Sequence, residues 1–571
     1  MTTFLGVHDG HNASLAVVRN GRVEFALQEE RLTREKNQGD APVRALAEAR
    51  GFAADTAPVG LNGHYMNYHQ WRRETIIGDY ERSSNLAGRL KQPLKGTLLD
   101  RVYQRRKAHA RAEALAATGF ARERLQPVEH HLAHASAAYY TCPWKDGRTL
   151  VFTCDGSGDR LSATVSIGEG GRLTRIAEVS EHDSIGRVYA LVTRRLAMTP
   201  LEHEYKVMGL APYAKGPETE RAAKMLLDAF EFLPSGLAWK RKRGVPSMYA
   251  AYQWLATSTR GMRFDTLAGG AQRFIEVMLT RWVEAAVRET GIGRLACAGG
   301  VFMNVKANKR IAELPEVDYF EAFPSCGDET LSIGALYLES ARRFGDKTVK
   351  PLEHFYLGDA PQEADVLAAV KKSGFHYERP ADIADAVAKL LAEGHPVARC
   401  TGAMEFGARA LGNRSILADP KSQDVVRVIN RMVKKRDFWM PFAPMVKEER
   451  QHDYIQNPKN LRSPFMMMTF DTKENFRDLI AAVHNADLTC RAQILSRTHN
   501  PAMHDIISAF ERLTGGGIVL NTSFNLHGFP IVRTAEEALG VLRESGLEYL
   551  QVGDYLVHKR GAAASNGASS H

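Results

Sequence analysis

Two histidines and an aspartate have the residue types and spacing of a metal site. His130 and His134 lie in an alanine-rich run, and on a helix a spacing of four stacks both imidazoles on one face. Asp155 follows a β-branched run, Thr149–Cys154, and so stands at a predicted strand end. Two imidazoles and a carboxylate supply most of a mixed N/O shell for a divalent transition metal. The alternative is that both histidines are ordinary buried side chains, because such pairs are common by chance.

Two glycine-rich loops have the composition of anion-binding turns. The first, Asp155–Asp159, follows the predicted strand, and its glycines let backbone N–H groups approach a phosphate closely. The second is the Gly-Gly pair after the buried run Leu295–Ala298, and its alternative role is a structural turn. We expect both loops to contact a nucleotide. The candidate nucleotide-binding residues are Gly156, Ser157, Gly158, Gly299, Gly300 and Asn304.

A further acidic residue, Asp328, closes the loop Pro324–Asp328 before an apolar helix predicted over Leu331–Ser340. An aspartate at a helix start is an ordinary N-cap. With three ligands already assigned, we interpret Asp328 as a fourth ligand contributed from the opposite lobe. The predicted metal shell is therefore His130, His134, Asp155 and Asp328.

Cationic side chains gather in turn-rich segments of the C-terminal third. Arg409 and Arg414 lie among glycines, and their planar guanidinium groups suit two-point binding of a phosphate or carboxylate. Each cation alone is more simply a surface ion pair, but several in one domain indicate an anion pocket. The remaining candidates for this pocket are Lys434, Arg491, and the strand-end residues Asn521 and Ser523.

The elements that must position these residues occur twice. Strands are predicted over Thr3–Val7, Ser14–Val18 and Val23–Leu27, with an Asn-Gly hairpin turn between the last two. The same order of strand, Asp-Gly loop, strand, turn and strand recurs over Leu150–Val179. Two lobes with facing phosphate loops are the architecture of actin-like and sugar-kinase-like folds, which is an inference from fold analogy.

A second α/β domain is predicted after a linker near Phe344–Asp359, where helix–strand alternation resumes. The fold class is therefore α/β, with a two-lobed N-terminal domain and a separate C-terminal α/β domain. We place these domains at residues 1–350 and 351–560, and we expect the small polar tail 561–571 to be disordered.

Composition limits the classes of function. The 571 residues carry a formal net charge of +9, a modest excess that favours anionic small molecules without demanding nucleic acid. The 6 cysteines form no CxxC pair, which indicates reduced thiols in a cytoplasmic protein. No run of about 18 apolar residues occurs, so we expect no membrane span. The basic stretch Trp71–Arg111 is interpreted as a solvated helical face, although an anionic partner is the alternative.

Motifs along nearly the whole chain resemble those of the bacterial O-carbamoyltransferases of the NodU and CmcH type, which modify nodulation factors and antibiotics. The longest and most specific motif is MEFGARALGNRSILADP, Met404–Pro420. The others are HNAS (11–14), EER (29–31), HHLAHA (130–135), DGSGD (155–159), YKVMGLAPY (205–213), AGGVFMN (298–304), PFAP (441–444) and LNTSFNLHGFPIV (520–532).

This resemblance implies a two-part enzyme. The C-terminal domain would be YrdC-like and would convert carbamoyl phosphate and ATP, with Mg²⁺, into a carbamoyl adenylate. The N-terminal domain would be TsaD-like and would transfer the carbamoyl group to a hydroxyl of a small-molecule acceptor at a metal, Fe(II) or alternatively Mn(II) or Zn(II). By motif position, His130, His134, Asp155 and Asp328 fall on metal ligands, His11 on the base in transfer, and Arg409, Lys434, Arg491, Asn521 and Ser523 on carbamoyl-phosphate and adenylate contacts.

The chain departs from the family pattern at four places. Asn12 stands where Asp is frequent, Ala408 where Pro is usual, Phe438–Met440 where the run is more polar, and Phe529 where Glu is usual. Two alternative functions share part of the pattern. A tRNA threonylcarbamoyladenosine-forming enzyme has both domain types, but the Met404–Pro420 signature speaks against it. An actin-like ATPase would not need the second anion pocket. We expect no membrane or nucleic-acid partner. The sequence leaves open whether the chain forms a homodimer.

Overall fold

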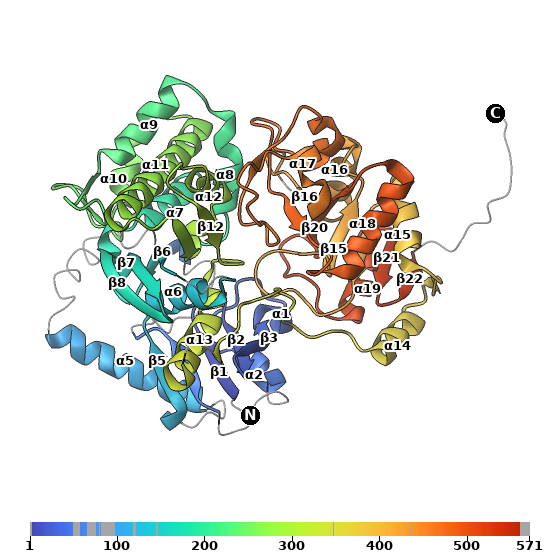
Figure 1. Ribbon diagram of the computed structural model, residues 1–571, viewed down its shortest axis with the longest axis horizontal. Helices are drawn as coiled ribbons and strands as arrows, with labels where there is room; N and C mark the ends of the chain where they lie inside the picture. The colour runs from blue at the N-terminus through green and yellow to red at the C-terminus, as the bar shows by residue number, and fades with distance from the viewer. Residues whose placement is uncertain are drawn as a thin grey trace.

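The computed structural model shows two α/β parts side by side, the N-terminal part in blue to yellow-green and the C-terminal part in yellow to red (Figure 1). It describes residues 3–49, 57–64, 76–78, 80, 98–117, 122–143, 147–345, 348–434 and 437–559. The predicted α/β fold class is confirmed. The predicted tail, 561–571, and most of the basic stretch 71–111 lie outside the described residues.

The first sheet is built from an antiparallel meander extended by parallel strands. β1 (Thr3–His8), β2 (Ser14–Arg19) and β3 (Arg22–Gln28) form the meander, and β4 (Val59–Asn62) and β5 (Leu125–Val128) add parallel to β1. The strand order is β3-β2-β1-β4-β5. The Asn-Gly pair between β2 and β3 has left-handed φ angles of 51° and 80°, so the predicted hairpin turn is confirmed.

The second sheet repeats this topology. β6 (Thr149–Gly158), β7 (Leu161–Glu169) and β8 (Arg172–Ser180) form the meander, and β11 (Arg294–Ala298) and β12 (Tyr319–Ala322) add parallel to β6. Its strand order is β12-β11-β6-β7-β8. Read from the other end, β8-β7-β6-β11-β12 matches β3-β2-β1-β4-β5 of the first sheet strand for strand. The predicted internal repeat is therefore confirmed, and two such lobes are the actin-like, sugar-kinase-like architecture.

Two helices connect the lobes. α13 (Leu331–Phe344) packs on β1, β2 and β4 of the first sheet and on α6 (His130–Thr141), which covers β6 and β11 of the second. A Cβ at Gly334 would lie 1.9 Å from the Ala133 carbonyl oxygen, so only glycine allows the two helices to approach this closely. This packing places the start of α6 and the loop before α13 at the same point between the lobes.

The remaining helices of the N-terminal part pack on the sheets or on one another. α7 (Ile185–Arg195) packs on β6, and α11 (Phe264–Thr290) packs against α7. The others are α1 (Glu30–Thr33), α2 (Val43–Ala49), α5 (Leu98–Ala116), α8 (Glu204–Leu210), α9 (Pro217–Leu227), α10 (Tyr252–Ser258) and α12 (Val305–Ala312), with a small hairpin of β9 (Phe230–Phe232) and β10 (Trp239–Arg241).

The C-terminal part contains a sheet of eight strands with helices on both faces. Its order is β13-β22-β21-β14-β15-β20-β16-β19. α14, α16 and α19 contribute to the apolar cluster on one face, and α15 and α18 to the cluster on the other. The elements are α14 (Glu363–Ser373), β13 (His376–Glu378), α15 (Ile383–Ala392), β14 (Val397–Cys400), β15 (Arg414–Ala418), α16 (Gln423–Ile429), β16 (Ala443–Lys447), α17 (Gln451–Tyr454), β17 (Phe470–Asp471), β18 (Thr489–Cys490), β19 (Gln493–Leu495), α18 (Pro501–Thr514), β20 (Ile518–Ser523), α19 (Ala535–Glu544), β21 (Tyr549–Val552) and β22 (Tyr555–His558).

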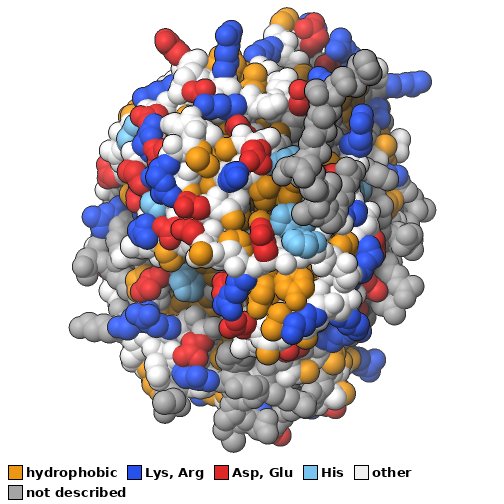
Figure 2. Space-filling model, turned by 90° about the vertical axis from the view of Figure 1, so that its right-hand side faces the viewer, with side chains coloured by type: hydrophobic (Ala, Val, Ile, Leu, Met, Phe, Trp, Pro, Cys, Tyr) orange, Lys and Arg blue, Asp and Glu red, His pale blue; other side chains and the backbone are white. Residues whose placement is uncertain are grey.

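The two parts share apolar contacts. The largest core cluster runs from the N-terminal lobes to Phe406, Leu411 and Phe465 of the C-terminal part. All six cysteines are buried and free, in agreement with the prediction of reduced thiols. Among the helices of the described residues, none combines the length and apolar character that crossing a membrane requires. Figure 2 shows one face of the molecule, on which Lys and Arg side chains are interspersed with Asp and Glu.

Candidate functional site

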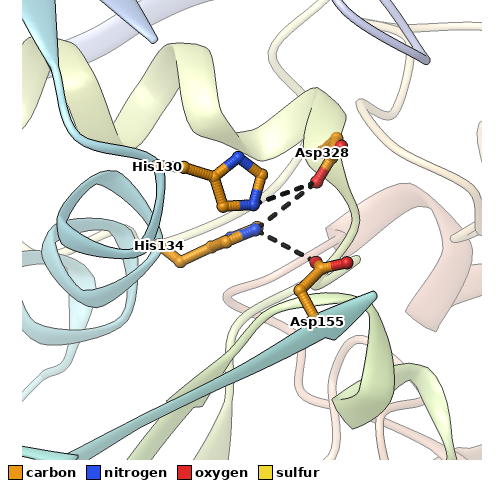
Figure 3. A group of neighbouring side chains, drawn as sticks. All are labelled: His130, His134, Asp155 and Asp328. Carbon is orange, nitrogen blue, oxygen red and sulfur yellow. Dashed lines mark ion pairs between the residues drawn. The ribbon is translucent and has the colours of Figure 1, made fainter. Parts of the chain in front are cut away.

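The four predicted metal ligands converge between the two lobes (Figure 3). His134 Nε2 lies 3.3 Å from Asp155 Oδ2 and 3.5 Å from Asp328 Oδ1, and His130 Nε2 lies 3.8 Å from Asp328 Oδ1. One ligand atom from each of the four residues lies within 4.8 Å of all the others. Two imidazole nitrogens and two carboxylate oxygens at such spacing could hold a divalent ion.

The helix start that carries the two histidines is fixed by its neighbours. Glu129 caps α6 by accepting hydrogen bonds from the N–H groups of His131 and Leu132. The carboxylate of Asp159 accepts the N–H of His130 at 2.8 Å. A Cβ at Gly158 would lie 2.1 Å from the His130 ring. The last glycine of the DGSGD loop is therefore required by the position of an imidazole.

His131 does not join the cluster. Its Nδ1 lies 2.9 Å from Thr153 Oγ1, as expected for a ring that points around the helix from His130. The N-cap alternative for Asp328 is wrong, because α13 begins after Thr330 and the Asp328 side chain makes no capping hydrogen bond. Asp328 instead faces the two histidines.

The cluster lacks the hydrogen bonds that buried polar groups normally make. In the described part of the chain, neither Nε2 of His130 and His134 nor Oδ1 of Asp328 has a hydrogen-bond partner. Burial opposes a charged His134 ring, but its ion pairs with Asp155 and Asp328 outweigh burial and raise its pKa to about 9. Burial likewise opposes ionisation of Asp328, and the neighbouring histidines overcome it and lower the pKa of its carboxyl. The site thus attracts positive charge, and a divalent ion fits it.

His11 lies in the loop after β1, at the edge of the same cavity as Asp155 and Asp328. Burial lowers the pKa of its ring, against the pull of the nearby carboxylates. A neutral imidazole at pH 7 is able to accept a proton. Asn12, which replaces the frequent Asp, has a left-handed φ of 62°, a conformation that Asn tolerates well.

The two glycine loops bind the Asp155 carboxylate through backbone N–H groups, and some of their residues line the cavity. Gly300 N–H donates to Asp155 Oδ2 at 2.8 Å, and Gly156 N–H donates to Oδ1 of the same carboxylate. Gly156, Gly300 and Asn304 line the cavity, whereas Ser157, Gly158 and Gly299 are not among its lining residues. Ser157 accepts a hydrogen bond from the Tyr249 hydroxyl at 2.7 Å. Asn304 caps α12, so part of the predicted nucleotide set has a structural role.

Four of the six predicted anion-pocket residues line this same cavity: Arg409, Lys434, Arg491 and Ser523. The buried ammonium of Lys434 donates to Ser523 Oγ at 3.0 Å and to Asn525 Oδ1 at 2.6 Å. The Nε of Arg409 has no hydrogen-bond partner among the described residues. Asn521 is buried beneath the pocket, where its amide donates to the Ala410 carbonyl at 2.9 Å.

Our interpretation of Arg414 as an anion-binding residue is wrong. Arg414 is fully buried in β15, and its guanidinium donates to the carbonyls of Thr401 at 2.9 Å and Arg533 at 3.2 Å. These carbonyls hold the side chain within the domain. Sequence alone does not separate it from Arg409, because both stand among glycines in one motif.

One cavity of about 530 Å³ joins the two predicted sites, since residues of both parts line it. The loops that carry Asp328 and Arg409 are bonded to each other: Ser325 Oγ accepts the Ala408 N–H at 2.9 Å. Arg31 of the EER motif donates to the Gly407 carbonyl at 2.7 Å. Enclosure of the intermediate between the two domains is expected from the chemistry, and the shared lining of the cavity supports it.

Several cavity residues are not apparent from the sequence. Asn525 holds Lys434, and Tyr205 and Lys206 line the cavity from α8. Asn525 lies two residues beyond the end of β20 at Ser523, in the same run of short polar side chains. Tyr205 and Lys206 lie inside the motif YKVMGLAPY, whose residue types alone indicate no role.

Comparison with known proteins assigns the family. The family model described as "Carbamoyltransferase N-terminus" matches residues 3–337, and "Carbamoyltransferase C-terminus" matches residues 388–559. The chain therefore belongs to the carbamoyltransferase family and is an enzyme of that family, which confirms the predicted resemblance.

The curated relatives include nodulation proteins. The nodulation protein NolNO of Sinorhizobium fredii is 31% identical over 97% of this chain and 80% of its own length. The nodulation protein NolO of Bradyrhizobium diazoefficiens is 33% identical over 76% of this chain and 80% of its own. Nodulation protein U of Sinorhizobium fredii is 32% identical over 48% of each chain.

Solved structures are more distant. Full-length HypF in its phosphate- and nucleotide-bound form is 12% identical over 60% of this chain and 56% of its own, with a TM-score of 0.32. A ROK hexokinase from Thermus thermophilus is 15% identical over 59% of this chain and 99% of its own, with a TM-score of 0.24. These similarities are low, so the fold assignment rests on the shared strand order of the two lobes.

Proposed function

We propose that the protein is an ATP-dependent O-carbamoyltransferase, which forms a carbamoyl adenylate in its C-terminal part and transfers the carbamoyl group to an acceptor hydroxyl beside the metal-ligand cluster. The observation that supports this most is the single cavity lined by Asp155 and Asp328 and also by Arg409 and Lys434. A labile intermediate made at one end of such a cavity reaches the other end without entering bulk water.

Activation is assigned to the cationic end. Carbamoyl phosphate and water give carbamate and orthophosphate, and a carbamate oxygen then attacks the α-phosphorus of ATP while pyrophosphate leaves. Arg409, Lys434 and Arg491 offset the charge that gathers on the phosphoryl oxygens. Burial lowers the pKa of Arg409, but an arginine remains charged at neutral pH, and this one has no ion pair with the described residues to break.

Transfer is assigned to the end that carries His11. The acceptor oxygen attacks the carbamoyl carbon, AMP leaves, and the hydroxyl proton passes to the His11 ring. An alcohol is a weak nucleophile at pH 7, so a positioned neutral imidazole contributes about 10²–10⁴ in rate. A Cβ added at Gly156 would meet no described atom within 4 Å, which leaves room for a phosphate against its backbone.

The four-residue cluster would hold the metal. Its mixed imidazole and carboxylate set suits Fe(II), our first assignment, and also Mn(II) or Zn(II). When bound, the ion would supply Lewis-acid polarisation of the nucleotide phosphate. The protein's part is to present the four ligands from α6, β6 and the loop before α13.

Pyrophosphate release tests the proposal. The full chain is incubated with carbamoyl phosphate, ATP and Mg²⁺. We expect release by the wild type and a loss of about 10²–10³ in rate for Arg409→Ala. Arg512→Ala is the matched control, because this exposed arginine pairs with Asp385 at 2.6 Å and is not among the residues that line the cavity. Equal release by the wild type and Arg409→Ala would contradict the assignment.

A further inference from the structure

Part of the rim through which the cavity opens to solvent is apolar, beside the exposed Lys36 and His527. Of the described residues that line the cavity, three exposed ones are large and hydrophobic: Leu201 at 37%, Tyr205 at 37% and Phe529 at 48% exposure. Leu201 and Tyr205 belong to the N-terminal part and Phe529 to the C-terminal part, so both parts contribute apolar surface. Soluble proteins expose grouped apolar side chains where they bind something.

The charges near this rim are already paired. Lys36 lies 3.7 Å from Glu202, and Lys206 lies 3.1 Å from Asp437 across the two parts. Glu204 accepts the Leu201 N–H at 2.8 Å. Equal numbers of carboxylates and of Lys and Arg side chains line the whole cavity. A polycationic or polyanionic acceptor would therefore have to break existing ion pairs to bind here.

The Phe529 segment of the rim is held in place by hydrogen bonds. The carbonyl of Phe529 accepts the side-chain amide of Asn525 at 2.7 Å, and Asn525 also binds Lys434. Arg34, next to α1, donates to the carbonyls of Pro530 at 3.0 Å and Ile531 at 2.8 Å. An aromatic side chain on such an anchored segment binds a ligand with little ordering cost.

We infer that the rim formed by Leu201, Tyr205 and Phe529 is the acceptor-binding site, and that it selects an uncharged hydroxyl compound with an apolar face. This inference rests on the proposed function, because the acceptor hydroxyl must approach His11 through the cavity. Aromatic side chains stack on flat or apolar ligand surfaces and exclude water from them.

Matched probes test the selectivity without knowledge of the natural acceptor. Binding of phenyl β-glucoside, methyl β-glucoside and the polycation kanamycin to the full chain is measured by calorimetry, and carbamoylation of each by mass spectrometry. We expect the phenyl glucoside to bind at least about tenfold more tightly than the methyl glucoside. We expect Phe529→Glu and Tyr205→Ala each to bring the two glucosides to within about threefold of one another.

Phe264→Ala is the matched control, since Phe264 is 60% exposed and lies outside the cavity lining; it should keep the wild-type preference. Equal or undetectable binding of the two glucosides, or tighter binding of kanamycin, would overturn the inference. Pyrophosphate release is measured in parallel. Its absence in the wild type would show that the proposed function has failed, whereas its presence without the binding preference would show that only the rim assignment has failed.

Discussion

The His8 ring donates a hydrogen bond from Nε2 to the backbone carbonyl of His11, at 2.9 Å. A carbonyl only accepts, so neutral His8 carries its proton on Nε2, and its Nδ1 accepts the Asn62 amide at 3.2 Å. Burial lowers the pKa of His8 to about 4, which keeps the ring neutral at pH 7. His8 is therefore a positioning residue for the loop that carries His11.

Two substitutions of His8 distinguish its hydrogen-bonding role from a role in filling space. His8→Leu removes both hydrogen bonds, and we expect AMP release from the adenylate to fall about tenfold or more, because a misplaced base is inefficient. His8→Gln retains a side-chain N–H donor and should keep most of the rate. The two variants are compared by their rates of AMP release, with water as the acceptor. Equal loss in the two variants would indicate that His8 acts only by filling space.

Metal content should depend on two histidines and not on the third beside them. His130→Ala/His134→Ala removes half of the candidate ligand set, so we expect bound metal to fall below one tenth of the wild-type content. His131→Gln is the control, because His131 binds Thr153. Elemental analysis of the purified full chain gives the answer. Full occupancy in the double variant would exclude this cluster as the metal site.

Arg111 is the buried end of the basic stretch, not part of a solvated face. Its guanidinium binds the Asp9 carboxylate through two bonds, 2.5 and 2.7 Å long, and also the carbonyls of Asn62 and Gly63. Arg111→Met would leave Asp9 buried and unpaired, at a cost of about 3–5 kcal/mol.

Thermal unfolding measures this cost. We expect a lower midpoint for Arg111→Met, by about 3–4 °C, and a change within about 1 °C for Arg122→Met, whose exposed side chain pairs with Glu113. Similar midpoints for the two variants would mean that the buried pair contributes nothing to stability.

Glu321, on β12, gives the fold a pH dependence that is independent of the metal cluster. Burial raises the pKa of Glu321 to about 7, despite Arg462 and a hydrogen bond from Tyr319, which both lower it. Between pH 4.5 and 7 the folded chain holds a proton that the unfolded chain has lost. The free energy of unfolding contributed by Glu321 is thus full below pH 4.5 and declines as the pH rises to 7.

Glu321→Gln should remove this decline. At pH 8 the variant should be more stable than the wild type, by about 3 kcal/mol, and at pH 4.5 the two should be alike. Chemical unfolding at both pH values measures the difference, with the exposed Glu316→Gln as the control. A stability difference that does not change with pH would contradict the raised pKa of Glu321.

Much of the fold and of the metal cluster could be predicted from sequence, because local patterns determine them. The i, i+4 spacing placed His130 and His134 on one face of α6, and the Asn-Gly turn located the β2–β3 hairpin. The repeated strand order predicted two lobes. The prediction that Asp328 comes from the lobe opposite Asp155 is wrong, because Asp155 lies at the end of β6 and Asp328 follows β12, and both strands belong to the second sheet.

The features that sequence did not reveal depend on tertiary packing. Arg409 and Arg414 look equivalent in the motif, yet only the carbonyls around Arg414 show that it is structural. Gly158 and Asp159 have the pattern of an anion-binding loop, whereas in the fold they hold His130. The domain limits 1–350 and 351–560 remain a prediction, because the largest apolar cluster extends across them.

The central claim is that activation and transfer occur in one cavity and use different residues. The most direct test follows labelled carbamoyl phosphate and ATP on the full chain, with pyrophosphate, carbamoyl adenylate and AMP measured together. His11→Ala should release pyrophosphate and accumulate carbamoyl adenylate, while AMP release falls by about 10²–10⁴. Arg409→Ala should form no adenylate. If His11→Ala also formed no adenylate, or if it released AMP at the wild-type rate, the division of roles between the two ends of the cavity would be wrong.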